Sequence, residues 1–172
     1  MVAVRTGSRE GVSMMTKLSK DDSTEVRGET DERRAITTRL GEILQAACDK
    51  DFERLAGYHL DSPKFTKFDD FEPLERQDAT TAMKSEADGL GAVDNLVMGA
   101  EDLKVDVFGT VGVATFVLAY GFDLPSSGGA VASPPAEGEH LDVRARATLV
   151  FVREGDQWLI AHEHLSAFKS NP

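Results

Sequence analysis

The stretch TLVFVREGDQWLIAHEHLSAF, residues 148–168, predicts two antiparallel strands joined by a tight turn, Glu-Gly-Asp, at 154–156. In a strand with a strict period of two, successive side chains point to opposite faces. The second strand then carries two histidines on one face and a single carboxylate among aliphatic groups on the other. The first face holds Trp158, Ile160, His162, His164 and Ser166, and the second holds Leu159, Ala161, Glu163, Leu165 and Ala167.

The strand before the turn also has one aliphatic face, which we expect to pack on helices. That face carries Leu141, Val143, Ala145, Ala147, Leu149 and Phe151, and the opposite face carries Asp142, Arg144, Arg146, Thr148 and Val150. Pairing that is symmetric about the turn places Glu163 opposite Ala147, Arg146 opposite His164, and Thr148 opposite His162. Glu163 would therefore point into the core or into a cavity.

The rest of the chain predicts an α+β domain, because helical periods come first and a period of two follows. A first helix begins at Thr30, a plausible N-cap, and buries one apolar stripe. Asp51 can cap a second helix, and a long mobile hairpin loop is expected over 124–140. The other expected elements are helices at 52–58 and 78–90, a short strand at 64–68, and long strands at 96–108, 111–122 and 141–152.

Length and charge limit the classes of function. The 172 residues suffice for one domain, and a net charge of -11 makes nucleic acid and anionic membranes poor partners. The single cysteine, Cys48, and the lack of an apolar run of about 20 residues favour a cytoplasmic protein. Residues 1–28 are polar and without periodicity, so we expect a flexible tail there and a domain over 29–169.

Glu163 is the main candidate catalytic residue. Burial disfavours the charged form of a carboxyl group, so Glu163 could transfer protons near neutral pH. In the alternative, Glu163 accepts hydrogen bonds from a buried Tyr58, Tyr120 or Lys67, or lies at the sheet margin. His59, next to Tyr58, is a further candidate acid or base at the mouth of a cavity, with a surface histidine as its alternative.

His162 and His164 could chelate one metal ion, since alternate residues of a strand face the same side. Arginine is an unfavourable neighbour for a cation, however, and no third ligand is evident on that face. We therefore expect no metal and no cofactor. The interpretation that we favour is a polar surface in a homodimer interface, formed by Arg144, Arg146, His162 and His164.

Aromatic, aliphatic and thioether residues along the chain could line a ligand cavity, although each could equally fill the core. The candidates are Phe52, Phe65, Phe68, Met83, Met98, Phe116, Tyr120, Ala147, Leu149, Phe151 and Leu165. Neither a glycine-rich phosphate loop nor a nucleophile elbow is present in the sequence.

The order of three helices, the KFTKF strand and four long strands ending in GDQWLIAHEHLSAF resembles the nuclear transport factor 2-like superfamily, in its SnoaL-like and ketosteroid isomerase-like branch. The resemblance covers about 30–168. The ending W-x-x-x-H-x-H-x-S is also similar to the association domain of calcium/calmodulin-dependent kinases. The resemblance implies a cone-shaped, curved antiparallel sheet packed on the three N-terminal helices, a cavity on its concave side, and dimerisation through the sheet.

Several family residues are missing at the matching positions. Thr148 or Leu149 stands where ketosteroid isomerases have a buried acid, and the first helix offers no tyrosine. A pocket base after the second helix could only be a neighbour such as Asp61, Asp69 or Asp70. The pocket arginines of the kinase association domains fall near Leu149 and Leu165, so an anionic ligand is not favoured.

Two functions of different class remain. The first is an isomerase, cyclase or dehydratase type of enzyme on a small hydrophobic molecule, with Glu163, His59 and Tyr58 as catalytic residues; it predicts a closed pocket with Glu163 in its wall. The second is a non-catalytic homodimeric ligand-binding or assembly domain. It predicts that Glu163 is paired or lies at the sheet edge, and that no cavity of about 300 Å³ exists.

Overall fold

The computed structural model describes residues 20–125 and 139–168, and in this part the chain forms three helices and one five-stranded sheet. The helices are α1 (Lys20–Cys48), α2 (Phe52–Ala56) and α3 (Ala79–Gly91). The strands are β1 (Thr66–Phe68), β2 (Asp94–Phe108), β3 (Val111–Asp123), β4 (His140–Glu154) and β5 (Gln157–Ala167). None of the described helices is both long and apolar enough to cross a membrane.

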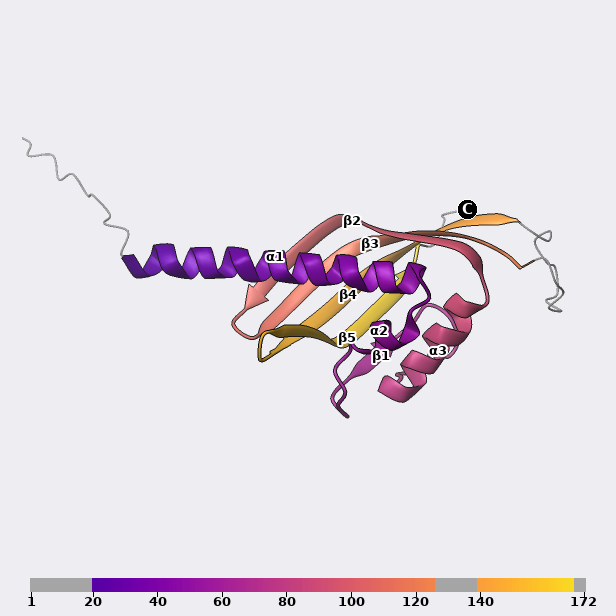
Figure 1. Cartoon of the computed structure of the whole chain (residues 1–172), viewed down its shortest axis with the longest axis horizontal. Helices are drawn as coiled ribbons and strands as arrows, with labels where there is room; N and C mark the ends of the chain where they lie inside the picture. The colour runs from indigo at the N-terminus through magenta and orange to yellow at the C-terminus, as the bar shows by residue number, and fades with distance from the viewer. Residues whose placement is uncertain (1–19, 126–138, 169–172) are drawn as a thin grey trace, which may run out of the picture.

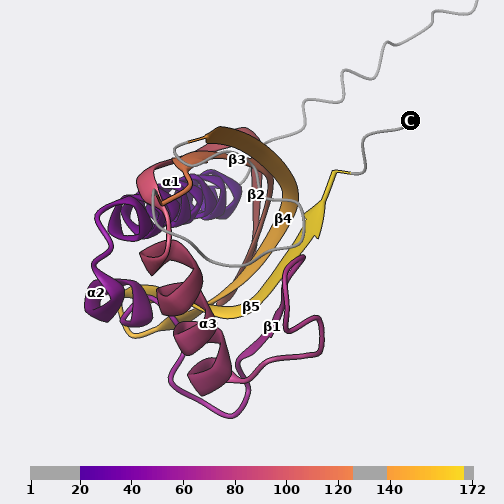
Figure 2. The same ribbon diagram turned by 90° about the vertical axis from the view of Figure 1, so that its right-hand side faces the viewer.

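The sheet has the order β1-β5-β4-β3-β2, in which β2 to β5 form an antiparallel meander and β1 runs parallel to β5 at the edge. It curves around the helices, so that α1 and α3 lie on its concave side (Figures 1 and 2). This confirms the predicted α+β class and the curved sheet packed on helices.

Helix α1 begins at Lys20, ten residues before the predicted start at Thr30. The apolar stripe begins only at Ile36, whose side chain is fully buried, and earlier turns of the helix project beyond the sheet (Figure 1). Ion pairs between neighbouring turns, such as Arg33 with Glu29 at 2.5 Å, replace an apolar face there. The first helix therefore starts earlier than predicted and includes 20–28 of the expected flexible tail, and 1–19 lie outside the described residues.

Both shorter helices are capped by an aspartate, of which Asp51 was predicted and Asp78 was not. The carboxylate of Asp51 accepts a hydrogen bond from the amide of Arg54 at 3.1 Å, and that of Asp78 accepts one from Thr81 at 2.9 Å. Helix α2 ends at Ala56, two residues before the predicted end. Most of the loop predicted over 124–140 lies outside the described residues.

A β-bulge interrupts β5, and the predicted strict alternation is wrong. Phe151 pairs with Ile160, but the next pairs are Val150 with His162 and Leu149 with Glu163, so Ala161 is an extra residue. Trp158, Ile160 and Glu163 are consequently all buried. The predicted pairs shift accordingly: Glu163 lies opposite Leu149 instead of Ala147, His164 opposite Thr148 instead of Arg146, and His162 opposite Val150 instead of Thr148.

Gly112 allows α1 to approach β3 closely. A Cβ atom added at Gly112 would lie 2.3 Å from Cδ1 of the buried Ile36. Gly112→Ala is therefore expected to lower the free energy of unfolding by about 1–3 kcal/mol, as overpacking of a core does. Urea denaturation measures this, with Gly99→Ala in β2 as the control, because no heavy atom lies within 4 Å of its added Cβ. Equal effects of the two substitutions would contradict the close-packing explanation.

Candidate ligand cavity

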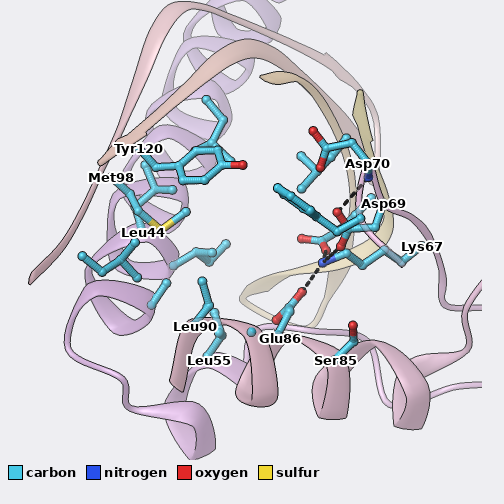
Figure 3. Close-up of a pocket in the computed structure, with 18 of the residues that line it drawn as sticks. Leu44, Leu55, Lys67, Asp69, Asp70, Ser85, Glu86, Leu90, Met98 and Tyr120 are labelled. Atoms are coloured by element: carbon cyan, nitrogen blue, oxygen red, sulfur yellow. Dashed lines mark hydrogen bonds and ion pairs between the residues drawn. The ribbon is translucent and has the colours of Figure 1, made fainter. Parts of the chain in front are cut away.

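A cavity of about 400 Å³ lies between the concave face of the sheet and the helices (Figure 3). Most of its wall is apolar, and α1, α3 and the three longest strands contribute to it. The apolar lining consists of Leu40, Ile43, Leu44, Ala47, Leu55, Phe71, Leu90, Val93, Leu96, Met98, Phe116, Leu118, Phe122, Leu149 and Leu165. A wall of this kind suits a small hydrophobic molecule.

One side of the cavity is polar and is organised by Lys67. This side chain lies on β1 and is only 3% exposed, and its Nζ lies 2.5 Å from Oε1 of Glu86 and 3.2 Å from Oε2 of Glu163. Asp69 approaches the same ammonium at 3.2 Å. Glu163 comes within reach because β1 and β5 pair with Lys67 opposite Glu163. We call His59, Lys67, Asp69, Glu86 and Glu163 the Lys67 cluster.

Most charges of this cluster stabilise one another, but at Glu86 burial and the neighbouring Glu163 outweigh Lys67 and raise the pKa. Burial acts to lower the pKa of Lys67, but the surrounding carboxylates outweigh it, so that the pKa lies well above its usual value. Burial acts to raise the pKa of Glu163, but Lys67 and His59 hold it well below its usual range. Burial does disfavour the charged form of Glu163, as predicted, but the predicted transfer of protons near neutral pH does not follow, because Lys67 and His59 keep the carboxyl ionised. The alternative, in which Glu163 is paired with Lys67, is confirmed.

His59 is buried and lines the cavity, so the surface alternative for it is wrong. Its Nδ1 lies 2.9 Å from the carbonyl oxygen of Leu55, which can only accept, so Nδ1 carries a proton. Its Nε2 lies 3.5 Å from Oε1 of Glu163, and a neutral ring would turn a lone pair toward that carboxylate. Burial acts to lower the pKa of His59, but Glu163 outweighs it and the pKa is raised.

Glu163→Gln is expected to lower the pKa of His59, because it removes the carboxylate that favours the imidazolium. NMR titration of the ring protons measures the shift. His140 is the control, because Asp123, 2.6 Å from its Nδ1, is the main cause of its raised pKa. An unchanged pKa of His59 in the variant would contradict the assignment of Glu163 as the group that raises this pKa.

The pair of His59 and Glu163 also predicts that stability depends on pH. Because the pKa of His59 is higher in the folded state, the pair contributes fully to stability below pH 6.5, the ordinary value for histidine. The contribution is lost as the pH rises through the pKa of the folded state. Glu163→Gln should therefore flatten the alkaline side of the stability profile measured by urea denaturation.

Asp70 stands in the cavity wall next to the Lys67 cluster, yet its carboxylate is not neutralised in the same way. Both carboxylate oxygens are buried and have no hydrogen-bond partner among the described residues. Burial and the neighbouring Asp69 raise the pKa of Asp70, and Lys67 opposes this only in part. Tyr120 points across the cavity toward this side (Figure 3). Burial and the two aspartates raise its pKa, so its hydroxyl remains a donor.

The structure brings some of the candidate residues to the cavity and leaves others outside it. Glu163 and His59 line it together, whereas the hydroxyl of Tyr58 accepts a hydrogen bond from Nε of Arg54 at 2.8 Å, outside the lining. The guanidinium of Arg39 covers the Tyr58 ring at 4.8 Å. Of the predicted lining residues, the cavity includes Met98, Phe116, Tyr120, Leu149 and Leu165.

The remaining predicted lining residues require correction, because they pack elsewhere. Phe65, Ala147 and Phe151 are buried in the core, and Phe52 and Met83 pack against that core. Phe68 is 38% exposed, and its ring contacts His162 and His164 instead of the cavity. Alternation along a strand identified the buried faces but could not separate core from cavity wall.

The opposite face of the sheet carries the residues predicted to form a dimer interface. Arg144, Arg146 and His164 are exposed there, and Nδ1 of the half-buried His162 lies 2.8 Å from the hydroxyl of Thr66. The ring of Phe168 lies 4.6 Å from the guanidinium of Arg146. The side chains thus share one face, and its use as an interface stays a prediction.

Among the described residues, His59, Glu86 and Glu163 have ligand atoms within 4.8 Å of one another, a spacing that a metal ion could use. The ammonium of Lys67 contacts both carboxylates and takes the position of a cation. Because the pKa of Lys67 is raised, a metal ion would have to displace a stable charge. We therefore assign this cluster to Lys67 and not to a metal.

Glu86 is the member of the cluster that sequence reasoning missed. A signal was present, since Glu86 lies four residues after Ala82 and four before Leu90, within the apolar stripe of the third helix. A carboxylate at such a position is buried when the helix packs. The sequence offers Asp70 only as one of three neighbouring aspartates, because nothing in it distinguishes Asp69, which contacts Lys67, from Asp70, which does not.

Comparison with known proteins supports this architecture. A family model described as a SnoaL-like domain matches residues 36–170. No curated protein matches the chain.

Solved structures share the fold at low sequence identity. A nuclear transport factor 2-like superfamily protein from Salmonella enterica superposes with a TM-score of 0.68 at 14% identity, covering 83% of this chain and 95% of that one. A candidate dehydratase of the nuclear transport factor 2-like family from Streptomyces avermitilis has a TM-score of 0.67 at 15% identity, covering 82% of this chain and 99% of that one. A candidate calcium/calmodulin-dependent protein kinase II association domain from Xanthomonas campestris has a TM-score of 0.60 at 18% identity, covering 78% of this chain and 86% of that one.

Proposed function

Because the chain belongs to the SnoaL-like domain family, in the nuclear transport factor 2-like superfamily, we propose that its concave cavity binds a small, mainly hydrophobic molecule and transfers protons to and from it. The cavity of about 400 Å³ supports the first part, since it exceeds the size expected of a non-binding domain. The pairing of Glu163 with Lys67 was expected of the non-catalytic alternative, so Glu163 itself does not support the second part.

The unpaired carboxylate of Asp70 in the cavity wall is the observation that supports proton transfer. The carboxylates of Asp69, Glu86 and Glu163 each contact Lys67, whereas that of Asp70 has no hydrogen-bond partner among the described residues. A carboxylate with a raised pKa is a stronger base than a free one, and this carboxylate lies in the cavity wall. We assign Asp70 the role of acid and base.

The reaction class that fits is removal of a proton from a carbon next to a carbonyl group. Asp70 would accept that proton while the C–H electron pair moves into the enolate, whose oxygen would accept a hydrogen bond from Tyr120. Return of the proton at another carbon gives an isomer. Loss of a hydroxide from the β-carbon, which leaves as water with a proton from Asp70, gives a dehydration. The assignment of a relative as a candidate dehydratase agrees with this class.

Solvent exchange of protons tests the class without knowledge of the natural substrate. Cyclic enones and β-hydroxyketones with two fused rings are incubated with the protein in D₂O, and loss of the α-proton signal is followed by NMR. Exchange faster than in buffer is expected for the compounds that bind. Binding without exchange would contradict catalysis and retain the binding function, and absence of both across the set would contradict the whole proposal.

The second candidate is a homodimeric assembly domain that uses the outer face of the sheet. It is favoured by the exposed Arg144, Arg146 and Phe168, which lie together on that face. Sedimentation equilibrium of the wild-type protein and of Arg146→Glu tests it. A dimer that the substitution dissociates supports this face as the interface, and a wild-type monomer contradicts it.

A further inference from the structure

The polar side of the cavity has more acidic than basic groups. Its described lining residues include five carboxyl groups, those of Asp69, Asp70, Glu72, Glu86 and Glu163, and they include no arginine. The basic groups are Lys67 and His59. Even with both of these charged, the ionised lining is negative. The net charge of the chain, -11, adds to the same potential and attracts cations to the site.

Asp70 carries one part of this excess negative charge, and the Lys67 cluster and Glu72 carry the rest. Lys67 lies within 3.2 Å of Asp69, Glu86 and Glu163, and Glu163 also has His59 at 3.5 Å. These contacts give each carboxylate of the cluster a basic neighbour, although Nε2 of His59 has no hydrogen-bond partner among the described residues. The two oxygens of Asp70 are buried and without a hydrogen-bond partner among the described residues, although each can accept two hydrogen bonds. A buried acceptor in this state costs stability unless a ligand donates to it.

Aromatic side chains line the cavity together with Asp70. The rings of Tyr120 and Phe122 are stacked, with their centroids 6.1 Å apart, and Phe71 follows Asp70 directly in the chain. The hydroxyl of Tyr120 points toward the side of Asp70 (Figure 3). A carboxylate combined with aromatic rings is the environment that ammonium groups prefer, through charge-assisted hydrogen bonds and cation–π contacts.

We propose that the ligand of this cavity is a hydrophobic amine, with its ammonium group at Asp70 and its apolar body against the leucine-rich wall. The inference rests on the proposed function, because it names the substrate class of the same cavity. A carboxylate ligand would add a sixth acidic group beside Asp70. An alcohol could donate only one hydrogen bond, whereas an ammonium group has three N–H donors and carries the compensating charge.

An amine is also compatible with proton transfer by Asp70. An ammonium group beside Asp70 lowers its pKa, which makes the carboxylate a weaker base but favours its ionised form, the form that accepts a proton. The positive charge of the ligand draws electrons from the neighbouring carbon and makes its C–H bond more acidic. One residue can therefore hold the ligand and act as the base.

Three probes with one apolar body test the inference. These are 3-phenylpropylamine, 3-phenylpropan-1-ol and 3-phenylpropanoate, and isothermal titration calorimetry measures their dissociation constants on the full-length protein at neutral pH. The amine is expected to bind at least about tenfold more tightly than the alcohol, because a hydrogen bond between charged groups contributes more binding free energy than one to a neutral donor. The carboxylate is expected to bind more weakly than the alcohol. Asp70→Asn should remove most of the amine's advantage and leave the affinity for the alcohol unchanged.

Asp61→Asn is the matched control, since it removes the same charge from an exposed residue outside the cavity lining. Equal affinities for amine and alcohol, or an amine preference that Asp61→Asn reduces as much as Asp70→Asn does, would overturn the inference. So would tighter binding of the carboxylate, or no binding by any probe. The proposed function is judged separately, by proton exchange in uncharged ketones, and can survive each of these results.

Discussion

Asp70→Asn is expected to lower the rate of α-proton exchange in a bound ketone by about 10²–10⁴-fold, the range that general acid–base catalysis contributes. The amide keeps the size of the side chain and cannot accept the proton. Ketone affinity should change little, because the apolar wall supplies most of the contact. The exchange rate of the wild-type protein should rise with pH through the raised pKa of Asp70 and then level, and the variant should lack this rise.

Stability measurements separate this catalytic role from a structural one. The carboxylate of Asp70 has no hydrogen-bond partner among the described residues, so Asn at this position should leave the free energy of unfolding unchanged or raise it. Asp61→Asn again serves as the control for charge. An Asp70→Asn variant that is folded and retains most of its exchange activity would exclude Asp70 as the base.

Lys67→Met is expected to lower the free energy of unfolding by about 3–5 kcal/mol at neutral pH, the cost of removing one partner from a buried ion pair. Methionine keeps an unbranched side chain one atom shorter than lysine but leaves Glu86, Glu163 and Asp69 without their common cation. Urea denaturation can be followed by the fluorescence of Trp158, the only tryptophan of the chain, which is 3% exposed.

The loss caused by Lys67→Met should shrink in acid. The lowered pKa of Glu163 in the wild-type protein contributes stability above pH 4.5, and this contribution is lost as the pH falls through the folded-state pKa. In the variant, the carboxyl groups protonate more easily because the ammonium is absent. Lys64→Met, at an exposed position three residues earlier, should change stability by no more than about 0.5 kcal/mol. A similarly small loss for Lys67→Met would contradict the role of the cluster.

The sequence predicted the elements of the fold because periodicity reports which face of an element is buried. It failed at Ala161, since an extra residue in a strand changes the geometry of pairing without changing the hydrophobic pattern enough to be recognised. It also failed at the start of α1, where ion pairs between neighbouring turns stabilise a polar helix.

The candidate site was predicted only in part. Glu163 and His59 lie in the cavity wall, which the sequence offered only as one alternative for each, and the charge state of Glu163 depends on Lys67, which lies on a different strand. A pKa reflects all neighbours in space, and sequence spacing within one hairpin shows few of them. Asp70 differs from Asp69 only through its position in space, which leaves its carboxylate without a hydrogen-bond partner among the described residues while Asp69 contacts Lys67.

The separation of paired from unpaired acids bears on how this domain could diverge in evolution. The ion pairs of Lys67 connect β1, β5 and α3, so substitutions there would be removed by selection for folding. Asp70 lies outside these pairs, in the segment between β1 and α3, and mutations at this position would cost little stability. Descendants of this chain could acquire new substrates through the 70–72 segment while inheriting the same scaffold unchanged.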